Sequence, residues 1–462
     1  MAAEASTMPG EASKMLFASF DLTDFDNKAG ASAFVKRCNK IGQVAHVALV
    51  GRRFSSKNCP AFKTDDGLLE LETIVGGMKT STLIPPQEIV QYLMQDETDS
   101  DSWDPDDEER LLGLYAAQLR WILNNLGLVE GEHYVLYCGG FASIAGLSRH
   151  AHCQDFAKLL GGINIQDPDV NFKDSWASGP LVSSPDEMNA FKKFWHNLPL
   201  EDRGSYFKKI AEAPPANERH LAPMDEFFKL HVQQSKPSIE VYSGGPLQSK
   251  PSIEVYSGGP LTTLANFPPE VSEHVKLIVA MSGAWNGSLN LLGTCFNNAV
   301  DIEATKVVLG GKFSKAIIVN VPTETCKAGV TFTPTTARLA ELLKDATPQK
   351  GVEILTKLHE QWTAIQHGKC APLFDCVPLL PLKVLHENCG IVEVTVIFGK
   401  NQKGLGTMFE NIGMTFEVVQ PGALELQPGA LELLPGKIYA TLPTVGPDMQ
   451  EAFEKDLSAT FQ

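Results

Sequence analysis

One stretch, PSIEVYSGGPLTTLANFPPEVSEHVKLIVAMSG (residues 251–283), decides the fold that this sequence predicts. It holds two largely apolar runs, 251–259 and 274–283, and both close on serine and glycine. Runs of this kind that are nearly continuously apolar are typical of strands buried on both faces of a sheet. The stretch therefore predicts two buried strands whose glycine-containing ends turn into loops.

Four further runs have the same character, at 15–21, 43–51, 133–140 and 315–322. Helical patterns lie between these runs, notably at 108–126 and 224–233. Strands that alternate with helices predict an α/β fold in which a mostly parallel sheet is covered on both faces. Ligands bind such sheets at the carboxyl ends of the strands, so we expect the functional site in the loops that follow these runs.

Composition narrows the possible partners. A net charge of −16 over 462 residues argues against nucleic acid and anionic membranes as partners. No apolar run approaches the length of a membrane span, which argues against a membrane protein. Nine cysteines occur without a C-x-x-C pair, which predicts reduced thiols and a cytoplasmic location.

Some segments are expected to lie outside the regular fold. Residues 1–14 are expected to form a flexible N-terminus, and residues 52–107 an acidic insertion. The run 96–110, which begins in that insertion, holds nine acids and one base, which is typical of a solvated loop.

Two segments occur twice without a single difference. They are QSKPSIEVYSGGPL, at 234–247 and 248–261, and QPGALEL, at 420–426 and 427–433. Such identity indicates a very recent duplication, or a segment that was recorded twice in the sequence. We expect the second copy of the longer segment to form the strand, because it is continuous with Thr262.

Acids cluster after the first predicted strand, where Asp21, Asp24, Asp26 and Asn27 fall within seven residues. Carboxylates this close repel one another unless protons or a cation relieve them. A hard cation with oxygen ligands, Ca²⁺ or Mg²⁺, would do so. The alternative is a helix N-terminus with surplus acids, since the helix dipole favours negative charge there.

A second polar segment, with Asn297 and Asp301, precedes a predicted helix at 302–309. Asp301 stands where an N-cap residue belongs. The apolar face of this helix is expected to contain Ala304, Val307 and Val308.

Asp375 stands alone in the apolar run APLFDCVPLL (371–380). Burying an unpaired carboxylate is costly, so Asp375 needs a partner. A cation shared by Asp375 and the first acidic loop would satisfy both.

Three motifs carry a family resemblance: GPLTTLA (259–265), MSG (281–283), and CFN (295–297) followed by Asp301 and Glu-Ala. Together they resemble the inosine–uridine-preferring nucleoside hydrolases, whose motifs read G-P-L-T-N-[IL]-A, M-G-G, and E-F-N with a following Asp and E-A. Looser similarity extends from Phe17 to about Phe409; the first loop resembles the family's D-x-D-x-x-x-D-D, and LFDC its H-D-x-L. The resemblance implies a single, doubly wound α/β domain over 15–462.

The resemblance also implies a Ca²⁺ that holds the ribose hydroxyls and an attacking water. The residues that match calcium ligands are Asp21, Asp24, Asp26, Thr262 and Asp375, with Asp24 and Asp26 as the catalytic carboxylates. The residues that match substrate-binding positions are Asn27, Met281, Cys295 and Asn297.

Several positions depart from the family pattern. Cys295 replaces a ribose-binding Glu, and Phe374 replaces a His that can protonate the leaving base. Thr263 and Arg52 replace asparagines, and the first loop is one residue short if Asp26 and Asn27 replace the Asp pair. These changes imply a weakened calcium site and an eroded nucleoside site.

The sequence therefore leaves the function open between two main alternatives. One is a calcium-dependent hydrolase of the N-glycosidic bond of a ribonucleoside, for which His367 or His386 would have to supply the missing proton. The other is a catalytically inactive protein that serves as a binding or scaffolding subunit, alone, as a homo-oligomer or in a complex. A phosphatase that uses Asp24 and Asp26 is a weaker third alternative, because its Ser/Thr and Lys partners cannot be placed.

Overall fold

The computed structural model describes part of the chain. The described residues are 14–21, 25–52, 69–75, 78–84, 112, 116, 119–142, 221–234, 251–285, 295, 297–298, 301–328, 332–365, 370–399, 413–419 and 433–462.

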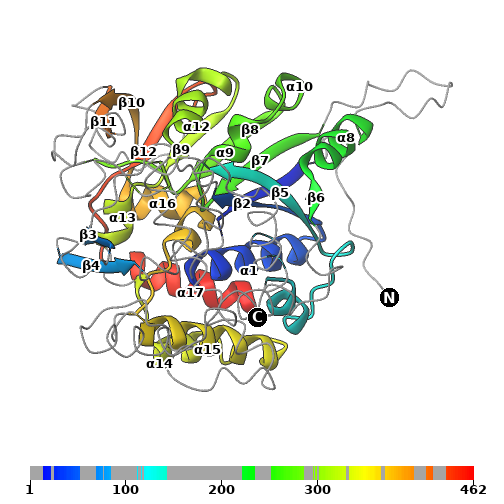
Figure 1. Cartoon of the computed structure of the whole chain (residues 1–462), viewed down its shortest axis with the longest axis vertical. Helices are drawn as coiled ribbons and strands as arrows, with labels where there is room; N and C mark the ends of the chain where they lie inside the picture. The colour runs from blue at the N-terminus through cyan, green and yellow to red at the C-terminus, as the bar shows by residue number, and fades with distance from the viewer. Residues whose placement is uncertain are drawn as a thin grey trace, which may run out of the picture.

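A ten-stranded sheet forms the centre of the molecule (Figure 1). Its order is β11-β10-β12-β9-β8-β7-β1-β2-β5-β6. The strands are β1 (Lys14–Phe20), β2 (Ala45–Arg52), β5 (Tyr134–Ala142), β6 (Ala222–Pro223), β7 (Ser252–Ser257), β8 (Val275–Ala280), β9 (Ile317–Asn320), β10 (Ile391–Gly399), β11 (Gly413–Val418) and β12 (Ile438–Thr441). All neighbours run parallel except β10, which is antiparallel to both β11 and β12.

The chain reverses its direction of travel across the sheet beside β1. It passes from β1 to β2 and β5 on one side, and later returns to β7, β8 and β9 on the other. Phe17 of β1 accordingly pairs with His46 of β2 and with Val255 of β7. In open parallel sheets a crevice forms at such a reversal, outside the carboxyl ends of the two strands. This places the expected crevice at the ends of β1 and β7.

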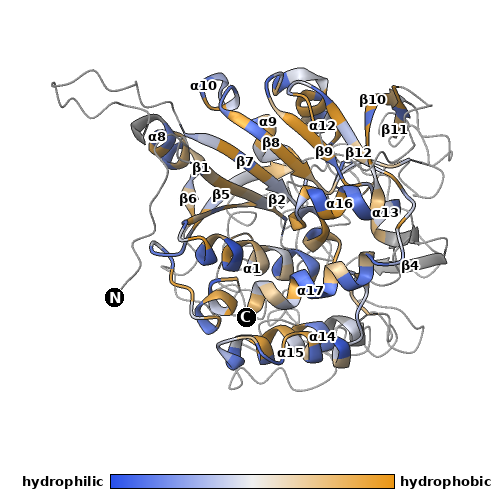
Figure 2. Ribbon diagram, turned by 180° about the vertical axis from the view of Figure 1, so that it is seen from behind, coloured by the Kyte–Doolittle hydropathy of each residue, from blue (hydrophilic) through white to orange (hydrophobic). Residues whose placement is uncertain are grey.

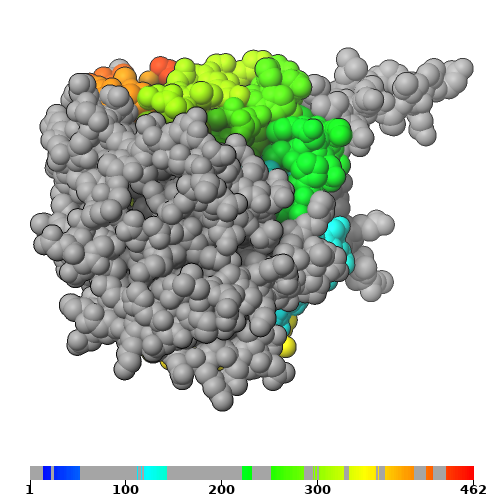
Figure 3. Space-filling view, viewed as in Figure 1, coloured from blue at the N-terminus to red at the C-terminus, as the bar shows by residue number. Residues whose placement is uncertain are grey.

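Helices cover both faces of the sheet (Figures 1 and 2). On one face lie α1 (Phe25–Lys40), α14 (Thr336–Leu342), α15 (Gln349–Ile365), α16 (Leu382–Cys389) and α17 (Met449–Phe461). On the other lie α8 (Met224–Gln234), α9 (Thr262–Ala265), α10 (Pro269–Ser272) and α12 (Ile302–Val307). The expected doubly wound α/β class with a mostly parallel sheet is confirmed. In the space-filling view, residues from α8 to α12, coloured green to yellow, form the surface along one edge (Figure 3).

Two hydrophobic cores explain why the strands are so apolar. Alternate residues of β1 enter different cores, because successive side chains of a strand point to opposite faces. Leu16 and Phe20 pack in the core that contains α1, whereas Met15 and Phe17 pack in the core that contains α8. A strand with a core on each side has no face left for polar residues, which accounts for the runs seen in the sequence.

The six predicted strands correspond to β1, β2, β5, β7, β8 and β9. The strand of the longer repeat is formed by its second copy, as expected. β6 and the three C-terminal strands were not predicted from the sequence. Within the expected insertion, β3 (Leu69–Val75) and β4 (Met78–Ile84) form a separate antiparallel pair, while the run 96–110 and residues 1–13 lie outside the described residues.

One expected helix face was wrong. Helix α12 buries Ala304, and Val308 directly after its end is buried too, but Val307 is 47% exposed. Thr305 is buried in its place, and its hydroxyl donates to the main-chain carbonyl of Asp301 (3.0 Å). A hydroxyl satisfied by its own helix can enter the core, so the buried face lies one residue earlier than the apolar pattern predicts.

The structure bears on two predictions from composition, the lack of a membrane span and the reduced state of the cysteines. None of the helices in the described part of the chain combines the length and the apolar character needed to cross a membrane. Seven cysteines lie in the described ranges, and all are free thiols.

Candidate functional site

The site is built on the close contact of β1 and β7 at their carboxyl ends. The amides of Gly258 and Gly259 both donate to the carbonyl of Ser19, at 2.9 and 3.3 Å. A Cβ atom on Gly259 would lie only 2.8 Å from the main-chain nitrogen of Asp21. Only glycine permits this approach, which explains why the strand closes on two glycines.

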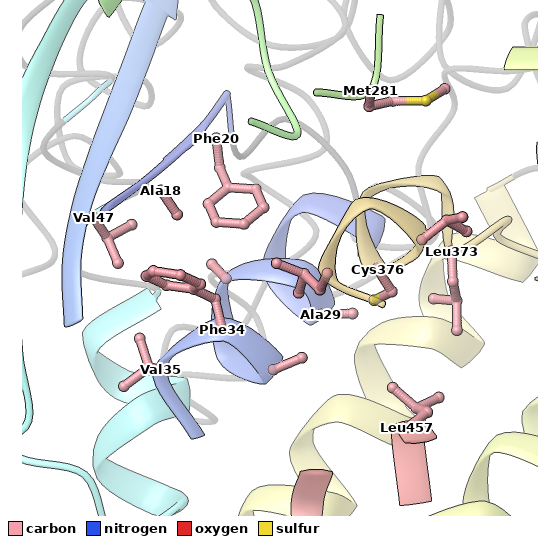
Figure 4. Packing of buried hydrophobic residues seen from close by; sticks show 14 of the residues in the cluster. Ala18, Phe20, Ala29, Phe34, Val35, Val47, Met281, Leu373, Cys376 and Leu457 are labelled. Atoms are coloured by element: carbon pink, nitrogen blue, oxygen red, sulfur yellow. The ribbon is translucent and has the colours of Figure 1, made fainter. Parts of the chain in front are cut away.

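Asp375 lies against the same turn. It belongs to η5 (Phe374–Leu379), a 3₁₀ helix that packs against α1 and β7. A Cβ atom on Gly258 would lie 2.7 Å from Cγ of Asp375, and one on Gly30 of α1 would lie 3.1 Å from its Cβ. Cys376, the next residue in the chain, lies beside Ala29 of α1 (Figure 4). The structure thus brings Asp375 to the end of β1, as predicted from the sequence.

Three carboxylates are buried around this turn: Asp21 (2% exposed), Asp26 (9%) and Asp375 (3%). Burial raises the pKa of the neighbouring Cys376 thiol, and the charges of Asp375 and Asp26 raise it further. Both acids therefore lie close enough to act on the same atom. Helix α1 begins at Phe25, so Asp26 is in its first turn, where the helix dipole also favours a carboxylate.

Asn297 joins the end of β7 to the end of β8. Its side-chain amide donates to the carbonyl of Gly258 (2.8 Å) and to that of Met281 (3.2 Å). The other amide predicted to bind ribose, that of Asn27, is buried in the first turn of α1. The two amides therefore come from separate segments of the chain. Met281 is itself buried, and its sulfur lies 3.8 Å from the thiol of Cys326.

Thr262 connects the site to α12. Its hydroxyl donates to one carboxylate oxygen of Asp301 (2.6 Å), while the other oxygen accepts from the amide of Ala304 (3.1 Å). Asp301 is therefore the N-cap of α12, as the sequence indicated. Burial raises its pKa, although both hydrogen bonds oppose that shift. Thr263 bonds the carbonyl of Gly139, which ties this turn to β5.

Cys295 occupies a buried, uncharged position. The amide of Gly283 donates to its sulfur (3.2 Å). Burial raises the pKa of the Cys295 thiol to about 11, and the charge of Glu324 contributes to the rise. Glu324 belongs to α13 (Thr323–Ala328), which follows β9, and is 8% exposed. The carboxylate of Glu324 thus lies near Cys295, the position at which the family pattern has a Glu. It comes from the segment that follows β9.

The described residues fit a calcium site only in part. Asp24 lies outside them, and within them no group of three or more His, Cys, Asp or Glu side chains is placed to hold a metal ion. Oxygen ligands are present in Asp21, Asp26 and Asp375, so a complete site would need residues beyond that part of the chain.

Of the two histidines proposed as proton donors, the structure describes His386. His367 lies outside the described residues. His386 lies on α16, which packs against α17 and β12. Phe374 begins η5 and packs against the core that contains α1. Its side chain is a hydrocarbon and has no exchangeable proton to donate.

Sequence reasoning missed two charged residues of this region, Glu324 and Lys28. Both are buried, at 8% and 6% exposure. Neither stands in a motif, so a role could be assigned to them only from the residues that surround them in space. For Lys28 a signal did exist, because it directly follows Asp26 and Asn27 in the acidic stretch.

Comparisons with known proteins give structural likenesses only. No protein-family model matches the chain, and no curated protein matches its sequence. An inosine–guanosine nucleoside hydrolase is 12% identical with a TM-score of 0.48, over 97% of this chain and 98% of that one. A plant nucleoside hydrolase, PpNRh1, is 11% identical with a TM-score of 0.46, over 96% and 99%. The type III effector XopQ, solved with adenosine diphosphate ribose, is 10% identical with a TM-score of 0.45, over 98% and 96%. Nothing about ligand or activity follows from these likenesses.

Proposed function

We propose that the crevice at the ends of β1 and β7 binds the ribose of a nucleoside or a related N-riboside, and that hydrolysis of its N-glycosidic bond is slow. The observation that supports this most is the gathering of Asp21, Asp26 and Asp375 with the amide of Asn297 around one glycine turn. The turn lies where the strand order reverses, which is the usual ligand position in such a sheet.

Ribose is a suitable ligand for this set of groups. Its 2′- and 3′-hydroxyls are donors, and ionised carboxylates are acceptors that form strong, charge-assisted hydrogen bonds. Glu324 would supply the carboxylate that position 295 lacks, from the end of β9. The base would lie toward Met281, an apolar and adaptable side chain.

Hydrolysis requires a nucleophilic water and a proton for the departing base. The carboxylates of Asp24 and Asp26 are our candidates for activating the water. A proton donor is lacking at Phe374, which has none, and at Cys295, which is buried. Loss of general-acid assistance typically costs about 10²–10⁴-fold in rate. Slow turnover of inosine, uridine or related nucleosides is the expected result.

Calcium belongs to this proposal as a weak ligand. Asp24, Asp26 and Asp375, with the main-chain carbonyl of Thr262, would hold it, and a bound cation lowers the pKa of its water. Asn27 brings less charge than the acid of the family pattern, and charge count tunes calcium affinity.

The second candidate function is that of a binding or scaffolding subunit without turnover. The buried thiol of Cys295 favours it, because burial keeps this thiol uncharged and unable to accept strongly from a sugar hydroxyl. Both candidates share the ribose site and differ only in the chemical step.

Titration calorimetry with inosine, uridine, adenosine and free ribose tests the proposal. We expect inosine to bind, and 2′-deoxyinosine to bind at least about tenfold more weakly, since it lacks a hydroxyl that a charged acceptor would hold. Asp375→Asn should weaken inosine binding, whereas the exposed Asp448→Asn should not. Equal affinity for inosine and 2′-deoxyinosine, or no binding of any nucleoside, would sink the proposal. Chromatographic detection of released base separates the two candidate functions.

A further inference from the structure

We infer that Arg37 is a positioning residue of the candidate site, whose guanidinium holds η5 against α1 and α17 and thereby fixes Asp375 beside Gly258. Its effect on ligand binding rests on the ribose site proposed above, whereas its hold on η5 stands on contacts of its own. The C-terminal helix is thus part of the support of the site, although it meets α1 at the end of that helix that lies away from the acids.

The guanidinium of Arg37 contacts two elements at once. Its Nη1 donates to the carbonyl of Leu379, the last residue of η5. Its Nη2 pairs with the carboxylate of Asp456, and its Nε donates to the hydroxyl of Thr460 (3.1 Å), both on α17. The last carbonyls of a helix have no donor within that helix, so a side chain or water must satisfy them. A planar, forked guanidinium can make all three bonds at fixed angles, which a lysine ammonium cannot reproduce.

Helical periodicity puts two contacts with η5 on one face of α1. Gly30 and Arg37 are seven residues apart, which is close to two full turns, so they lie on the same stripe of the helix at a spacing of about 10 Å. A Cβ atom on Gly30 would lie 3.1 Å from the Cβ of Asp375 and 3.2 Å from its carbonyl oxygen. From Asp375 to Leu379 a 3₁₀ helix rises about 8 Å. The two spans match, so η5 lies along α1, with Asp375 at Gly30 and Leu379 at Arg37.

The residue after Asp375 faces the same helix. Residues three apart in a 3₁₀ helix share a face, so Cys376 and Leu379 lie on one side of η5. Cys376 is 3% exposed and lies beside Ala29 of α1 (Figure 4). Burial raises the pKa of the Cys376 thiol, while the charge of Arg37 acts to lower it, so the guanidinium lies near this thiol too. Arg37 therefore contacts the side of η5 that packs on α1.

η5 has few means of holding itself in place. A 3₁₀ helix has poorer hydrogen-bond geometry than an α-helix. Pro378, inside η5, has no amide proton to donate, and the N-cap residue Leu373 makes no side-chain capping bond. The position of η5 therefore depends on tertiary contacts, of which Arg37 supplies a charged one. A carboxylate that binds a ligand must be held to within about 0.5 Å, so a looser η5 should weaken binding by Asp375 while the sheet stays folded.

A neighbouring lysine provides a matched control. Lys40, one turn further along α1, donates to the carbonyl of Ala459 of α17. It thus shares with Arg37 a contact between α1 and α17, whereas the bond to Leu379 comes from Arg37. Comparing the same substitution at the two positions separates the hold on η5 from the packing of α17.

Cysteine labelling of the full chain measures the hold on η5 without any ligand. N-ethylmaleimide reaches the buried Cys376 when η5 opens, and Cys389 of α16, also 3% exposed, is the reference within the same molecule. We expect Arg37→Met to be labelled at Cys376 at least about tenfold faster, with Cys389 changed by less than about twofold, and Lys40→Met to be labelled like the unmodified protein. Loss of the positive charge by itself would raise the pKa of the Cys376 thiol and slow the reaction, so faster labelling reports opening.

Mass spectrometry that locates the label gives a clear decision. No faster labelling at Cys376 in Arg37→Met, or an equal rise at Cys376 and Cys389, would overturn the inference, because the second result means a general loss of stability. If Arg37→Met fails to fold, Arg37→Lys takes its place, since it keeps the charge and loses the fork. The same selective rise at Cys376, but a smaller one, is then expected, and an unselective rise or none again overturns the inference.

Titration calorimetry with inosine measures the effect on the site, at a temperature where circular dichroism shows each variant folded. We expect Arg37→Met to bind inosine at least about tenfold more weakly than the unmodified protein, and Lys40→Met to bind it equally well. Unchanged inosine affinity in an Arg37→Met protein that is labelled selectively at Cys376 would show that η5 moves without effect on Asp375, which also overturns the inference. If the unmodified protein binds no nucleoside, the ribose site fails, and the labelling alone decides whether Arg37 holds η5.

Discussion

The side-chain amide of Asn297 donates a 2.8 Å hydrogen bond to the carbonyl of Gly258, and this bond ties the segment before α12 to the end of β7. Gly258 also touches Asp375, so one residue contacts both the amide and a carboxylate of the candidate site. Anything that moves Asn297 should therefore disturb ligand binding and stability together.

Replacing Asn297 tests this coupling. Asn297→Ala removes two hydrogen bonds to strand-end carbonyls, and leaving buried carbonyls without their donor costs about 1–3 kcal/mol. We expect urea unfolding to show such a loss, together with weaker inosine binding. Asn388→Ala is a suitable control, because that amide bonds a carbonyl of its own helix, that of Val384. An Asn297→Ala protein as stable as the control would contradict the proposed coupling.

Gly258 itself should not tolerate a side chain. In Gly258→Ala the new methyl group would lie 2.7 Å from Asp375 Cγ and from Phe20 Cδ1. Overpacking of this kind typically costs about 1–3 kcal/mol. At Gly310 nothing lies within 4 Å of the same methyl position, so Gly310→Ala should change unfolding little. The comparison fails if both variants unfold at the same urea concentration.

The central strands could be read from the sequence because both of their faces are buried. β1 and β8 stand between two cores, so their apolar residues are nearly uninterrupted. β10 pairs antiparallel on both sides near the sheet edge, and Ile391 and Val394 are its only buried residues, the others being half-buried or exposed. β12 has only four residues. Neither strand has the continuous apolar run that is typical of a strand buried on both faces.

The site was predictable only where residue type and chain position coincide. Asp301 follows a loop and precedes a helix, so its role as an N-cap could be read directly. Asp375 could be assigned to the site because a lone acid in an apolar run must have a partner. Glu324 could not be assigned, since it is brought to its neighbours by the order of the strands rather than by a local motif.

Glu324 offers a direct test of the ribose site. If it supplies the carboxylate near Cys295, then Glu324→Gln should weaken inosine binding by about ten- to hundredfold, the usual worth of a hydrogen bond to a charged group. Glu303→Gln removes an exposed carboxylate on α12 and should leave affinity unchanged. Calorimetry with both variants decides the matter, and equal affinities would exclude Glu324 from the site.

Acid should destabilise the fold through His46. This residue is buried on β2, its Nδ1 lies 2.9 Å from the Tyr137 hydroxyl, and burial lowers its pKa to about 4. The unfolded chain therefore binds the proton first, at about pH 6.5. Stability should be full above that pH and fall toward pH 4, by as much as about 3 kcal/mol. Burial lowers the pKa of His359 to about 4 as well, so it adds to the same window.

Urea unfolding between pH 7.5 and pH 4.5 measures this dependence. His46→Phe removes the titrating group and keeps an aromatic ring against Phe227, so its stability should fall less steeply with pH. His133→Gln, at a half-exposed position, should keep the slope of the unmodified protein. A slope unaffected by His46→Phe would show that other groups govern the acid sensitivity.

Activity is expected to be limited by the departing base. Phe374→His would return a proton donor to the residue before Asp375, and Cys295→Glu would return the carboxylate of the family pattern. If Glu324 already supplies that carboxylate, Phe374→His alone should give most of the increase in base release from inosine and uridine. The gains should also be non-additive in the double variant, because both groups act on one transition state.

Phe398→His, on β10 near the sheet edge, is the matched control. Rapid turnover by the unmodified protein would show that another residue, His367 or His386 first, donates the proton. No turnover even in the double variant would locate the defect in the acidic loop around Asn27 and favour the binding subunit.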